Sequence, residues 1–572
     1  MELRLPVALI LLSFATSTYA QTISPASSAS GAGASGPLDP SFAGFGIEPS
    51  NIFSFTGGSS ANELSVNLLQ NLADYSGAPP HIRLGGNTGD YMVYNSSYTS
   101  YDFQTNGNNI YSSSYLTFGD ALFKAINRFP TGTPITFGLN LAYEESDYIA
   151  NIVREAQAVL DNIGHLTLYS FEIGNEPDLY AKNGFRQGAW DGQIYTQEFL
   201  ERASAISEQV LKPAGYKEQF FESPATASTI GTTFTIDDLV SYGITKGTNG
   251  SGNLVSGWNQ HDYFYFVDVS TYGLTLDHLM ELSNTESQFA YWVTEVTAGL
   301  ATGLPYYLRE MASAGPTGLP NISNTFGAAL WTLNFFCYAA TLNISSVEMH
   351  MTDNSYAAAW MPISRPNSPT GVRPSYYAFA AMAQLIGSGN GTTQIAAVTP
   401  SGLPSEYTTY VRSYAAYTGS SLSAVVIING MQANISTTNK GGVTFELKNL
   451  PAGQELYISE LTADGADATA GTTWNGISFE DSDNGTPKTV NKTISTITIS
   501  NSGTASVYVR DSQAVIANIG FQLGTRDVTV AGGTSPSTKK PSLATSTGQG
   551  AKNAVLLALL ITAALAVFDF QC

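Results

Sequence analysis

The chain has 572 residues, of which 43% are hydrophobic and only 12% are charged, and its formal net charge is −21. This length allows two folded domains, each with a hydrophobic core of its own. The few Lys and Arg residues argue against a nucleic-acid partner, because they cannot neutralise a phosphate backbone. The same shortage argues against tight binding of densely sulfated polymers.

The N-terminus has the features of a secretory signal peptide over residues 1–20. Arg4 precedes a short apolar run, and small residues stand at Thr18 and Ala20, so cleavage after Ala20 is expected. The apolar run is too short to cross a bilayer as a helix. The small and polar residues 21–40 either lack regular structure or add a strand to a later β-sandwich.

Apolar strand-like runs alternate with amphipathic helical stretches over residues 41–387. The eight expected strands are Phe42–Ile47, His81–Gly85, Ile135–Leu141, Leu168–Ile173, Gln219–Ser223, Val255–Gln260, Phe289–Glu295 and Ser345–Met351. Helical spacing of apolar residues is clearest over Asp147–Ile163, Thr196–Val210 and Phe326–Leu342. This alternation predicts an α/β fold, a (β/α)₈ TIM barrel, whose active site would lie at the carboxyl ends of the strands.

The pattern changes after residue 387. Short alternating or β-branched runs, separated by Gly, Asn and Pro, cover Tyr407–Tyr417, Leu422–Ile428, Val443–Leu447, Glu455–Leu461, Thr493–Ile499 and Ala505–Val509. They predict an antiparallel β-sandwich over residues 388–515. A flexible Ser/Thr/Gly-rich stalk is expected over residues 516–550.

The C-terminal tail, residues 551–572, resembles the signal for a GPI anchor. Small polar residues around Ser546 and Gly548 precede an apolar run from Ala554 to Phe568. A single-pass helix is the alternative, but no Lys or Arg follows Phe568 to hold it on a cytoplasmic side. We therefore expect a secreted protein, anchored at the cell surface or cell wall, whose only membrane attachment is this lipid.

Cysteine and asparagine usage fits the same route. Only Cys337 and Cys572 are present, and the second lies in the tail, so the mature protein would have no internal disulfide. Eight Asn-X-Ser/Thr sequons predict N-glycosylation at Asn95, Asn249, Asn321, Asn343, Asn390, Asn434, Asn484 and Asn491.

The strongest local motif is the run Phe171–Asp178, in which an apolar strand ends in Asn-Glu-Pro. Glu176 would project from the carboxyl end of the fourth barrel strand, and Asn175 beside it could bind a sugar hydroxyl. Pro177 has no N–H and ends the strand. A lone strand-end Glu is more often a helix cap or an ion-pair partner, so this motif needs a second carboxylate to indicate catalysis.

Glu295 offers that second carboxylate, because it ends the run Tyr291–Val296, which we count as the seventh strand. Two such groups would face each other across the barrel mouth. Hydrolysis of a glycosidic bond needs this pair, one protonated with a raised pKa and one ionised, about 5–5.5 Å apart in retaining enzymes. The five His residues show no metal-ligand spacing, so no metal or other cofactor is expected.

Several further motifs accompany this pair along the barrel. They are Ile82–Asp90, Ser170–Tyr180, Gln260–Tyr263, Thr325–Trp331 and Val372–Tyr377. As a set they resemble glycoside hydrolase family 79 of clan A, which includes fungal β-glucuronidases and relatives of heparanase.

The resemblance implies that Glu176 is the general acid/base, Glu295 the nucleophile and Asn175 a contact to the sugar 2-hydroxyl. It further implies that His261 and Tyr263 orient the nucleophile. The motif around Arg83 and Asn87 would contribute to substrate binding. In relatives the loop after the nucleophile helps to hold a uronate carboxylate; the loop after Glu295 is apolar here, and Tyr356 is the candidate replacement.

We therefore expect a secreted retaining β-glycosidase, a β-glucuronidase acting on cell-surface or plant glycans by double displacement. One alternative is another β-glycosidase or a wall-remodelling transglycosylase on the same fold. A second is a catalytically silent glycan-binding surface protein, against which the presence of both glutamates counts. The oligomeric state stays open.

Overall fold

The computed structural model describes residues 21–108, 114–250, 252–366, 368–525 and 528. The predicted signal peptide, the GPI tail and most of the predicted stalk lie outside these residues. Within them, no helix combines the length and the apolar composition that a membrane crossing requires.

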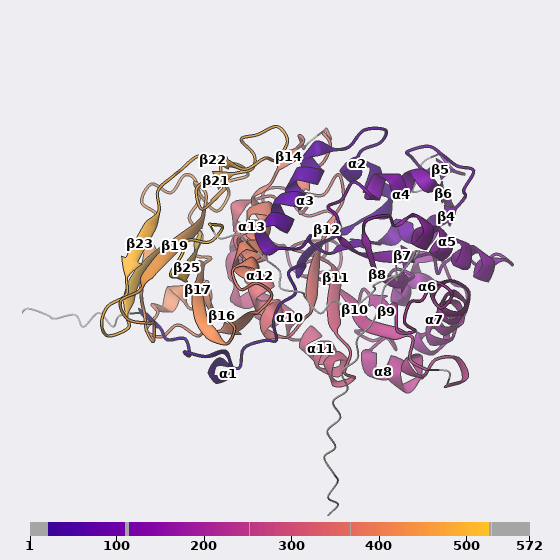
Figure 1. Ribbon diagram of the computed structural model, residues 1–572, viewed down its shortest axis with the longest axis horizontal. Helices are drawn as coiled ribbons and strands as arrows, with labels where there is room; N and C mark the ends of the chain where they lie inside the picture. The colour runs from indigo at the N-terminus through magenta and orange to yellow at the C-terminus, as the bar shows by residue number, and fades with distance from the viewer. Residues whose placement is uncertain (1–20, 109–113, 251, 367, 526–527, 529–572) are drawn as a thin grey trace, which may run out of the picture. The chain divides into compact units, whose positions relative to one another are not determined.

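Eight parallel strands close into a barrel in the order β10-β11-β12-β2-β3-β7-β8-β9 (Figure 1). Their bounds are β2 Ala43–Ile47, β3 Ile82–Leu84, β7 Pro134–Leu139, β8 Thr167–Ile173, β9 Phe221–Thr226, β10 Val255–Tyr263, β11 Tyr306–Ala312 and β12 Ser346–Met351. The predicted TIM barrel is confirmed, and every predicted strand but one overlaps a strand of the structure.

The exception is Phe289–Glu295, for which the strand prediction is wrong. These residues end helix α10 (Ser283–Phe289) and begin helix α11 (Trp292–Ala301), and the seventh barrel strand is β11 instead. Trp292, Val296 and Gly299 are the buried positions of α11 beside Glu295, at the four- and three-residue spacing of one helix face. A short apolar run does not distinguish a strand from a buried helix segment.

Helices surround the barrel in an outer layer (Figure 1). The longer ones are α3 Glu63–Ser76, α4 Asp120–Ile126, α5 Tyr148–Asn162, α7 Gly192–Ile206, α12 Phe326–Thr341 and α13 Pro374–Gly387. Shorter helices are α1 Ala29–Ala32, α2 Ile52–Thr56, α6 Tyr180–Asn183, α8 Ile236–Ser241 and α9 Leu276–Met280. A small sheet of β4 Met92–Tyr94, β5 Gln104–Thr105 and β6 Leu116–Phe118 follows β3, and β13 Trp360–Met361 pairs with β14 Gly371–Val372.

Helices α12 and α13 are buried on nearly all sides, because they pack against both the barrel and the sheets of the C-terminal domain. The Thr325 hydroxyl accepts a hydrogen bond from the N–H of Ala328 and caps α12. The Tyr414 hydroxyl, from the C-terminal domain, donates to Asn334 on α12 over 2.8 Å. The uninterrupted apolar pattern of α12 thus reflects contacts on two sides.

The C-terminal domain consists of two sheets with a shared hydrophobic core. The larger contains β15 Thr393–Ala397, β16 Val411–Thr418, β17 Ser421–Asn429, β25 Gln513–Ile519, β19 Glu455–Thr462, β20 Thr473–Trp474, β21 Ile477–Ser478, β22 Lys488–Thr489 and β23 Ser495–Thr498. The smaller contains β1 Gln21–Ile23, β18 Gly442–Leu447 and β24 Ala505–Arg510. Val425, Phe445 and Val507 belong to the core. The β-sandwich is confirmed, and residues 21–23 do add a strand, parallel to β18.

The predicted boundary between sandwich and stalk at residue 516 is wrong. It falls inside β25, which lies between β17 and β19 in the larger sheet. Ala514, Ile516 and Ala517 are all buried, so β25 lacks the alternation that marks a half-exposed strand. Leu523, a few residues further on, is also buried.

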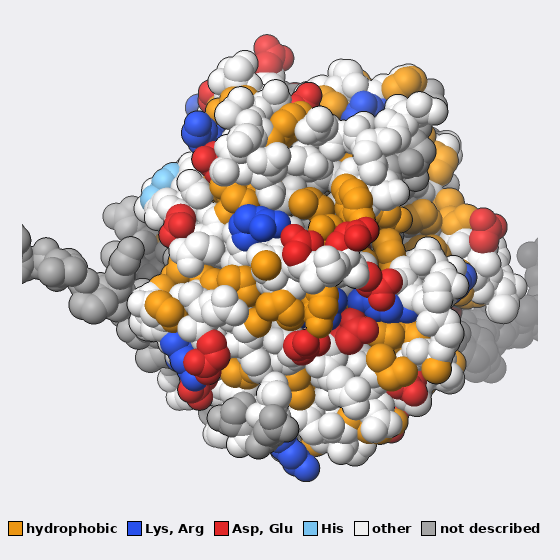
Figure 2. Space-filling view, turned by 90° about the vertical axis from the view of Figure 1, so that its right-hand side faces the viewer, with side chains coloured by type: hydrophobic (Ala, Val, Ile, Leu, Met, Phe, Trp, Pro, Cys, Tyr) orange, Lys and Arg blue, Asp and Glu red, His pale blue; other side chains and the backbone are white. Residues whose placement is uncertain are grey.

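The surface on the face shown in Figure 2 is mostly uncharged, and acidic side chains lie beside Lys and Arg. Six of the predicted glycosylation sites have exposed Asn side chains: Asn95, Asn321, Asn343, Asn390, Asn484 and Asn491. Asn434 is half-buried, and the side chain of Asn249 lies outside the described part. Glycan attachment stays a prediction. Cys337 is buried and forms no disulfide among the described residues.

Part of the barrel interior is occupied by buried charged side chains. Arg309 is fully buried; it donates to Glu222 over 2.6 and 2.8 Å and to Glu348 over 2.8 Å. The pairing of β11 shifts register between Leu308 and Met311. This bulge allows two consecutive residues, Arg309 and Glu310, to point into the barrel.

Replacing Arg309 with Leu is expected to lower the free energy of unfolding by about 3–5 kcal/mol, because two buried carboxylates lose their cation. Urea unfolding followed by tryptophan fluorescence measures the change. The matched control is Arg154→Leu on α5, whose contact with Asp147 is 3.8 Å long and about half exposed; its effect should stay below about 1 kcal/mol. Equal effects of the two substitutions would contradict a structural role for the buried network.

Candidate active site

Glu176 stands where the backbone turns sharply after β8. Its φ of 49° lies in the left-handed region, which residues other than Gly rarely adopt. The Glu176 N–H donates to the carbonyl of Ala225, at the end of β9, over 2.9 Å. Pro177 then begins a short 3₁₀ turn, Pro177–Leu179. A constrained backbone of this kind is common at functional sites, where the surrounding fold holds it in place.

The Glu176 carboxylate lies 3.0 Å from Nδ1 of His261 on β10. Burial raises the pKa of Glu176 to about 8, and the negative charge of Glu310 adds to the shift. Burial also lowers the pKa of His261 to about 4. At neutral pH, Glu176 is therefore protonated beside a neutral imidazole, as a general acid must be.

Glu295 does not reach this site. Its carboxylate accepts hydrogen bonds from the N–H of Ile236, at the start of α8, over 2.9 Å, and from Gln260 over 3.2 Å. Gln260 and His261 are neighbours on β10, so their side chains point to opposite faces of the strand. Glu295 thus caps a helix in the outer layer, and its predicted place at the barrel mouth is wrong.

Glu310 on β11 occupies the position expected of the second carboxylate. It accepts hydrogen bonds from Arg83 over 2.6 Å and from the Tyr263 hydroxyl over 2.7 Å, and His350 lies 3.6 Å away. Burial opposes ionisation of Glu310. Electrostatic interactions with His350, His261 and Arg83, together with the hydrogen bond from Tyr263, outweigh the effect of burial and hold the pKa of Glu310 below its usual range.

Glu176 and Glu310 face each other closely. One carboxylate oxygen of each, together with a ring nitrogen of His261, lie within 4.8 Å of one another. The two carboxyl groups lie about 5–5.5 Å apart in retaining glycosidases and about 6.5–9.5 Å apart in inverting ones, so this short distance favours a retaining mechanism. The two pKa shifts have opposite directions, as an acid and a nucleophile require. The three groups also have the spacing of metal ligands, but Arg83 already compensates the charge of Glu310.

Arg83 connects the parts of the site. It is fully buried, and besides Glu310 it donates to Glu172 over 2.5 Å and to the amide oxygen of Asn175 over 2.7 Å. The Asn175 amide in turn donates to Asn87 over 3.0 Å, and Asn87 is exposed. Arg83 therefore positions Glu310 and Asn175 from below, and Asn87 lies on the open side.

The other predicted site residues fall into two groups. His261 contacts Glu176, and Tyr263 donates to Glu310. Both residues were predicted to orient Glu295, and neither does so. Tyr356 is not part of these contacts. Its N–H donates to the carbonyl of Thr317, and the Arg373 guanidinium lies 5.8 Å from the centre of its ring.

Sequence reasoning missed Glu310, His350 and Glu48. Each stands at or just after the carboxyl end of a barrel strand, the position where barrel enzymes place functional groups. Glu48 accepts hydrogen bonds from the Thr88 N–H and hydroxyl and lies 3.8 Å from His350. The sequence did contain signals for these residues, namely the pair Arg309-Glu310 and the ionisable residues in or next to β2 and β12. The pair Arg309-Glu310 was overlooked because the seventh strand was wrongly assigned to Phe289–Glu295.

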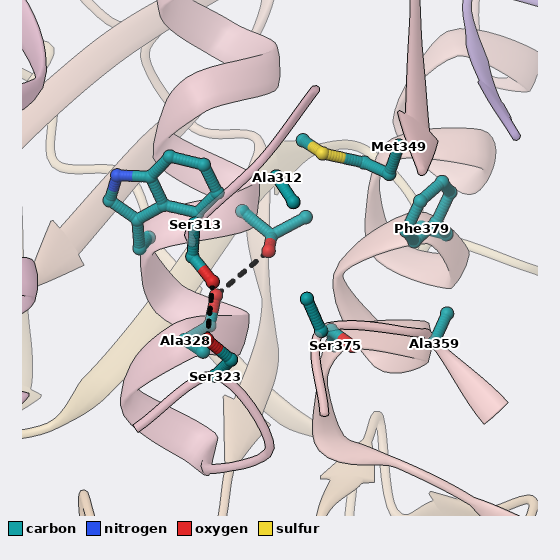
Figure 3. A pocket seen from close by; sticks show the side chains of 11 residues that line it. Ala312, Ser313, Ser323, Ala328, Met349, Ala359, Ser375 and Phe379 are labelled. Carbon is teal, nitrogen blue, oxygen red and sulfur yellow. Dashed lines mark hydrogen bonds between the residues drawn. The ribbon is translucent and has the colours of Figure 1, made fainter. Parts of the chain in front are cut away.

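A small hollow lies on the outer side of β11 and β12, against α12 and α13 (Figure 3). Met349 and Phe379 line one part of it, and the Ser313 hydroxyl donates to Ser323 over 3.0 Å in another. Its volume of about 10 Å³ is the space of one water molecule. It is too small for a sugar ring, and none of the carboxylates described above lines it.

Comparison with known proteins agrees with this geometry. Residues 413–516 match the glycosyl hydrolase family 79 C-terminal beta domain. A β-glucuronidase of Aspergillus niger is 30% identical over 77% of this chain and 82% of its own length. The chain belongs to glycoside hydrolase family 79. A β-glucuronidase of Neurospora crassa is 28% identical over 78% of this chain and 85% of its own length.

Solved structures show the same fold. A 4-O-α-L-rhamnosyl-β-D-glucuronidase from Fusarium oxysporum superposes with a TM-score of 0.71 at 21% identity, covering 87% of this chain and all of that one. A family 51 α-L-arabinofuranosidase from Bifidobacterium longum gives a TM-score of 0.56 at 11% identity, covering 87% of this chain and 99% of that one. These two likenesses show the fold, a TIM barrel with a C-terminal β-sandwich, and membership of family 79 makes the protein a glycoside hydrolase.

Tyr263→Phe tests the electrostatics of the site. Removing the hydroxyl removes a hydrogen bond that lowers the pKa of Glu310, so this pKa rises. The acid limb of kcat/KM should therefore move to higher pH by roughly one to two pH units, the scale of one hydrogen bond to a charged group. The matched control is Tyr306→Phe, whose hydroxyl bonds Gln260 in the outer layer. An unshifted acid limb in Tyr263→Phe would contradict the assignment.

Proposed function

We propose that this protein is a retaining β-glucuronidase in which Glu176 is the general acid/base and Glu310 the nucleophile. The observation that carries the proposal is the close approach of the partly exposed Glu176 and the buried Glu310, whose pKa values are shifted in opposite directions. The fungal relatives named β-glucuronidase support the choice of glycone.

In the first step, Glu310 attacks the anomeric carbon while Glu176 donates its proton to the glycosidic oxygen. The bond to the leaving group breaks, and the sugar becomes an ester of Glu310. Arg83 and Tyr263 hold the nucleophile oxygens in place, so little reorganisation accompanies the attack. Asn175, fixed by Arg83, is the candidate contact to the sugar 2-hydroxyl.

In the second step, Glu176 accepts a proton from water, which attacks the ester and regenerates Glu310. The same residue can act as acid and then as base because its pKa responds to the state of Glu310. Esterification removes the negative charge that helps to raise the pKa of Glu176. Glu176 therefore becomes a carboxylate at the stage where a base is needed.

The uronate carboxylate would lie beyond the ends of β11 and β12. With Glu310 as nucleophile, the loop that follows its strand β11 runs from Ser313 to Gly318. This loop bonds to the loop of Tyr356 through the Thr317 carbonyl. Its backbone N–H groups and the Tyr356 hydroxyl are the candidate donors to the uronate carboxylate.

The signal peptide, the GPI anchor and the glycans predicted from the sequence belong to the proposal as well. With them, the enzyme would act at the cell surface.

Glu310→Gln should reduce kcat on p-nitrophenyl β-D-glucuronide by about a thousandfold or more, the scale of a lost catalytic group. Glu295→Gln is the matched control and should retain most of the activity, because Glu295 lies in the outer layer. Neutral p-nitrophenyl glycosides are assayed beside the glucuronide. Loss of activity in Glu295→Gln alone, or turnover of neutral glycosides only, would refute the proposal.

The pH profile gives an independent check. Because the pKa of Glu176 is raised to about 8, the acid form persists through neutral pH and is lost as the pH rises through that value. The lowered pKa of Glu310 keeps the nucleophile ionised into the acid range. We expect kcat/KM to fall on the alkaline side around pH 8. A profile that falls instead with an alkaline midpoint near pH 5 would contradict a protonated resting Glu176.

A further inference from the structure

The exposed large hydrophobic side chains of the barrel gather in one part of its sequence. Among the described residues they are Ile230 and Val269, each 67% exposed, Tyr272, 37% exposed, and Tyr291, 43% exposed. Ile230 lies between β9 and α8, and the other three lie between β10 and α11. These four residues, called the apolar rim below, follow the two strands that come next to the acid/base strand β8 in the barrel.

Hydrogen bonds link this rim to Glu176. The Glu176 N–H donates to Ala225, and the Asp178 carboxylate accepts from the N–H groups of Ala227 and Ser228, each over 3.0 Å. The next residue, Thr229, donates to the Tyr291 hydroxyl over 3.1 Å. Ala225, which holds the Glu176 backbone, and Thr229, which holds the Tyr291 ring, are four residues apart, a distance of at most about 14 Å along the chain.

The second part of the rim is linked to the nucleophile side. The loop after β10 begins at Tyr263, which donates to Glu310. Phe266 packs edge-on against the Tyr263 ring at 5.4 Å, and Tyr265 packs against Tyr272 at 5.4 Å. Val269 and Tyr272 therefore belong to a loop that is held to the site by aromatic packing.

The charge of these loops restricts what could bind there. Residues 227–235 contain no charged side chain, and residues 264–275 contain only Asp268. An anionic leaving group would find no cation in either loop. Exposed apolar and aromatic side chains instead favour an uncharged group with a flat apolar face.

We propose that the apolar rim is the leaving-group subsite and accepts an uncharged group with a flat apolar face. The inference rests on the proposed function, because the general acid protonates the leaving-group oxygen and the leaving group must lie on the side of Glu176. Two sources have this chemistry, an aryl aglycone and a neutral pyranose of a glycan. The rim determines which β-glucuronides are cleaved, and the residues around Glu310 determine the glycone.

The test compares Tyr291→Ala with the wild type on three glucuronides. These are methyl β-D-glucuronide, 4-methylumbelliferyl β-D-glucuronide and β-D-glucuronosyl-(1→6)-galactose. The ratio of kcat/KM between variant and wild type is taken for each substrate, so the reactivity of the leaving group cancels. We expect a threefold to tenfold loss, mainly in KM, on a flat-faced substrate, the scale of one aromatic contact, and less than about twofold on the methyl glycoside.

Loss on the aryl substrate alone identifies an aryl aglycone, loss on the disaccharide alone identifies a glycan, and loss on both supports the subsite for either. An equal effect on all three substrates, or no effect on any, overturns the proposal. Ile230→Ser should change the ratios in the same direction. The control is Tyr508→Ala, because Tyr508 is 53% exposed and lies on the β-sandwich. This substitution should change none of the three kcat/KM ratios.

Two further measurements separate other causes of failure. Thermal unfolding of each variant shows whether the fold is intact. If the wild type cleaves no glucuronide but cleaves a neutral glycoside, the proposed glycone is wrong. The comparison of methyl, aryl and galactosyl leaving groups is then repeated on that glycone, so the rim is tested independently.

Discussion

The ion pair between Arg83 and Glu310 is the interaction on which the chemistry of the site depends. Glu310 is buried, and burial alone would favour its neutral form. Arg83 supplies the compensating charge from inside the barrel, and it is itself held by Glu172 and Asn175. The ionised Glu310 in turn raises the pKa of Glu176. His350, His261 and Arg83 therefore stabilise the ionised nucleophile, and the charge of the nucleophile in turn favours the protonated acid.

This arrangement requires a barrel interior with room for charged groups at two levels. Arg309 with Glu222 and Glu348 forms the lower level, and Arg83 with Glu172 and Glu310 forms the upper one. Gly46 on β2 makes space, because a Cβ there would lie 2.8 Å from the Arg309 carbonyl. The bulge in β11 gives one residue to each level. Polar groups replace the usual apolar layers, so every charge needs a partner from another strand.

The sequence predicted the barrel and the sandwich because their strands alternate with turns and helices in a regular pattern. It also placed Glu176, since Asn-Glu-Pro after an apolar strand can hardly lie elsewhere than at a strand end. It failed at Glu310 for two physical reasons. Tyr291–Val296 is an apolar run whose helical face becomes apparent only with its packing partners. The charged pair Arg309-Glu310 breaks the apolar pattern of β11, and its bulge breaks the two-residue period.

The local sequence indicated some features of the function and left others undetermined. Motifs indicate which residue types are available, whereas the ionisation of a buried carboxylate depends on groups from β3, β10 and β12 that are distant along the chain. His261 illustrates this: it lies two residues from Tyr263, yet the two support different carboxylates because adjacent inward positions on β10 face different neighbours across the barrel. The roles of residues in this site therefore depend on the closed barrel. The wrong seventh strand led to Glu295 being predicted as the nucleophile in place of Glu310, whereas the predictions of the acid, the fold and the reaction class were unaffected.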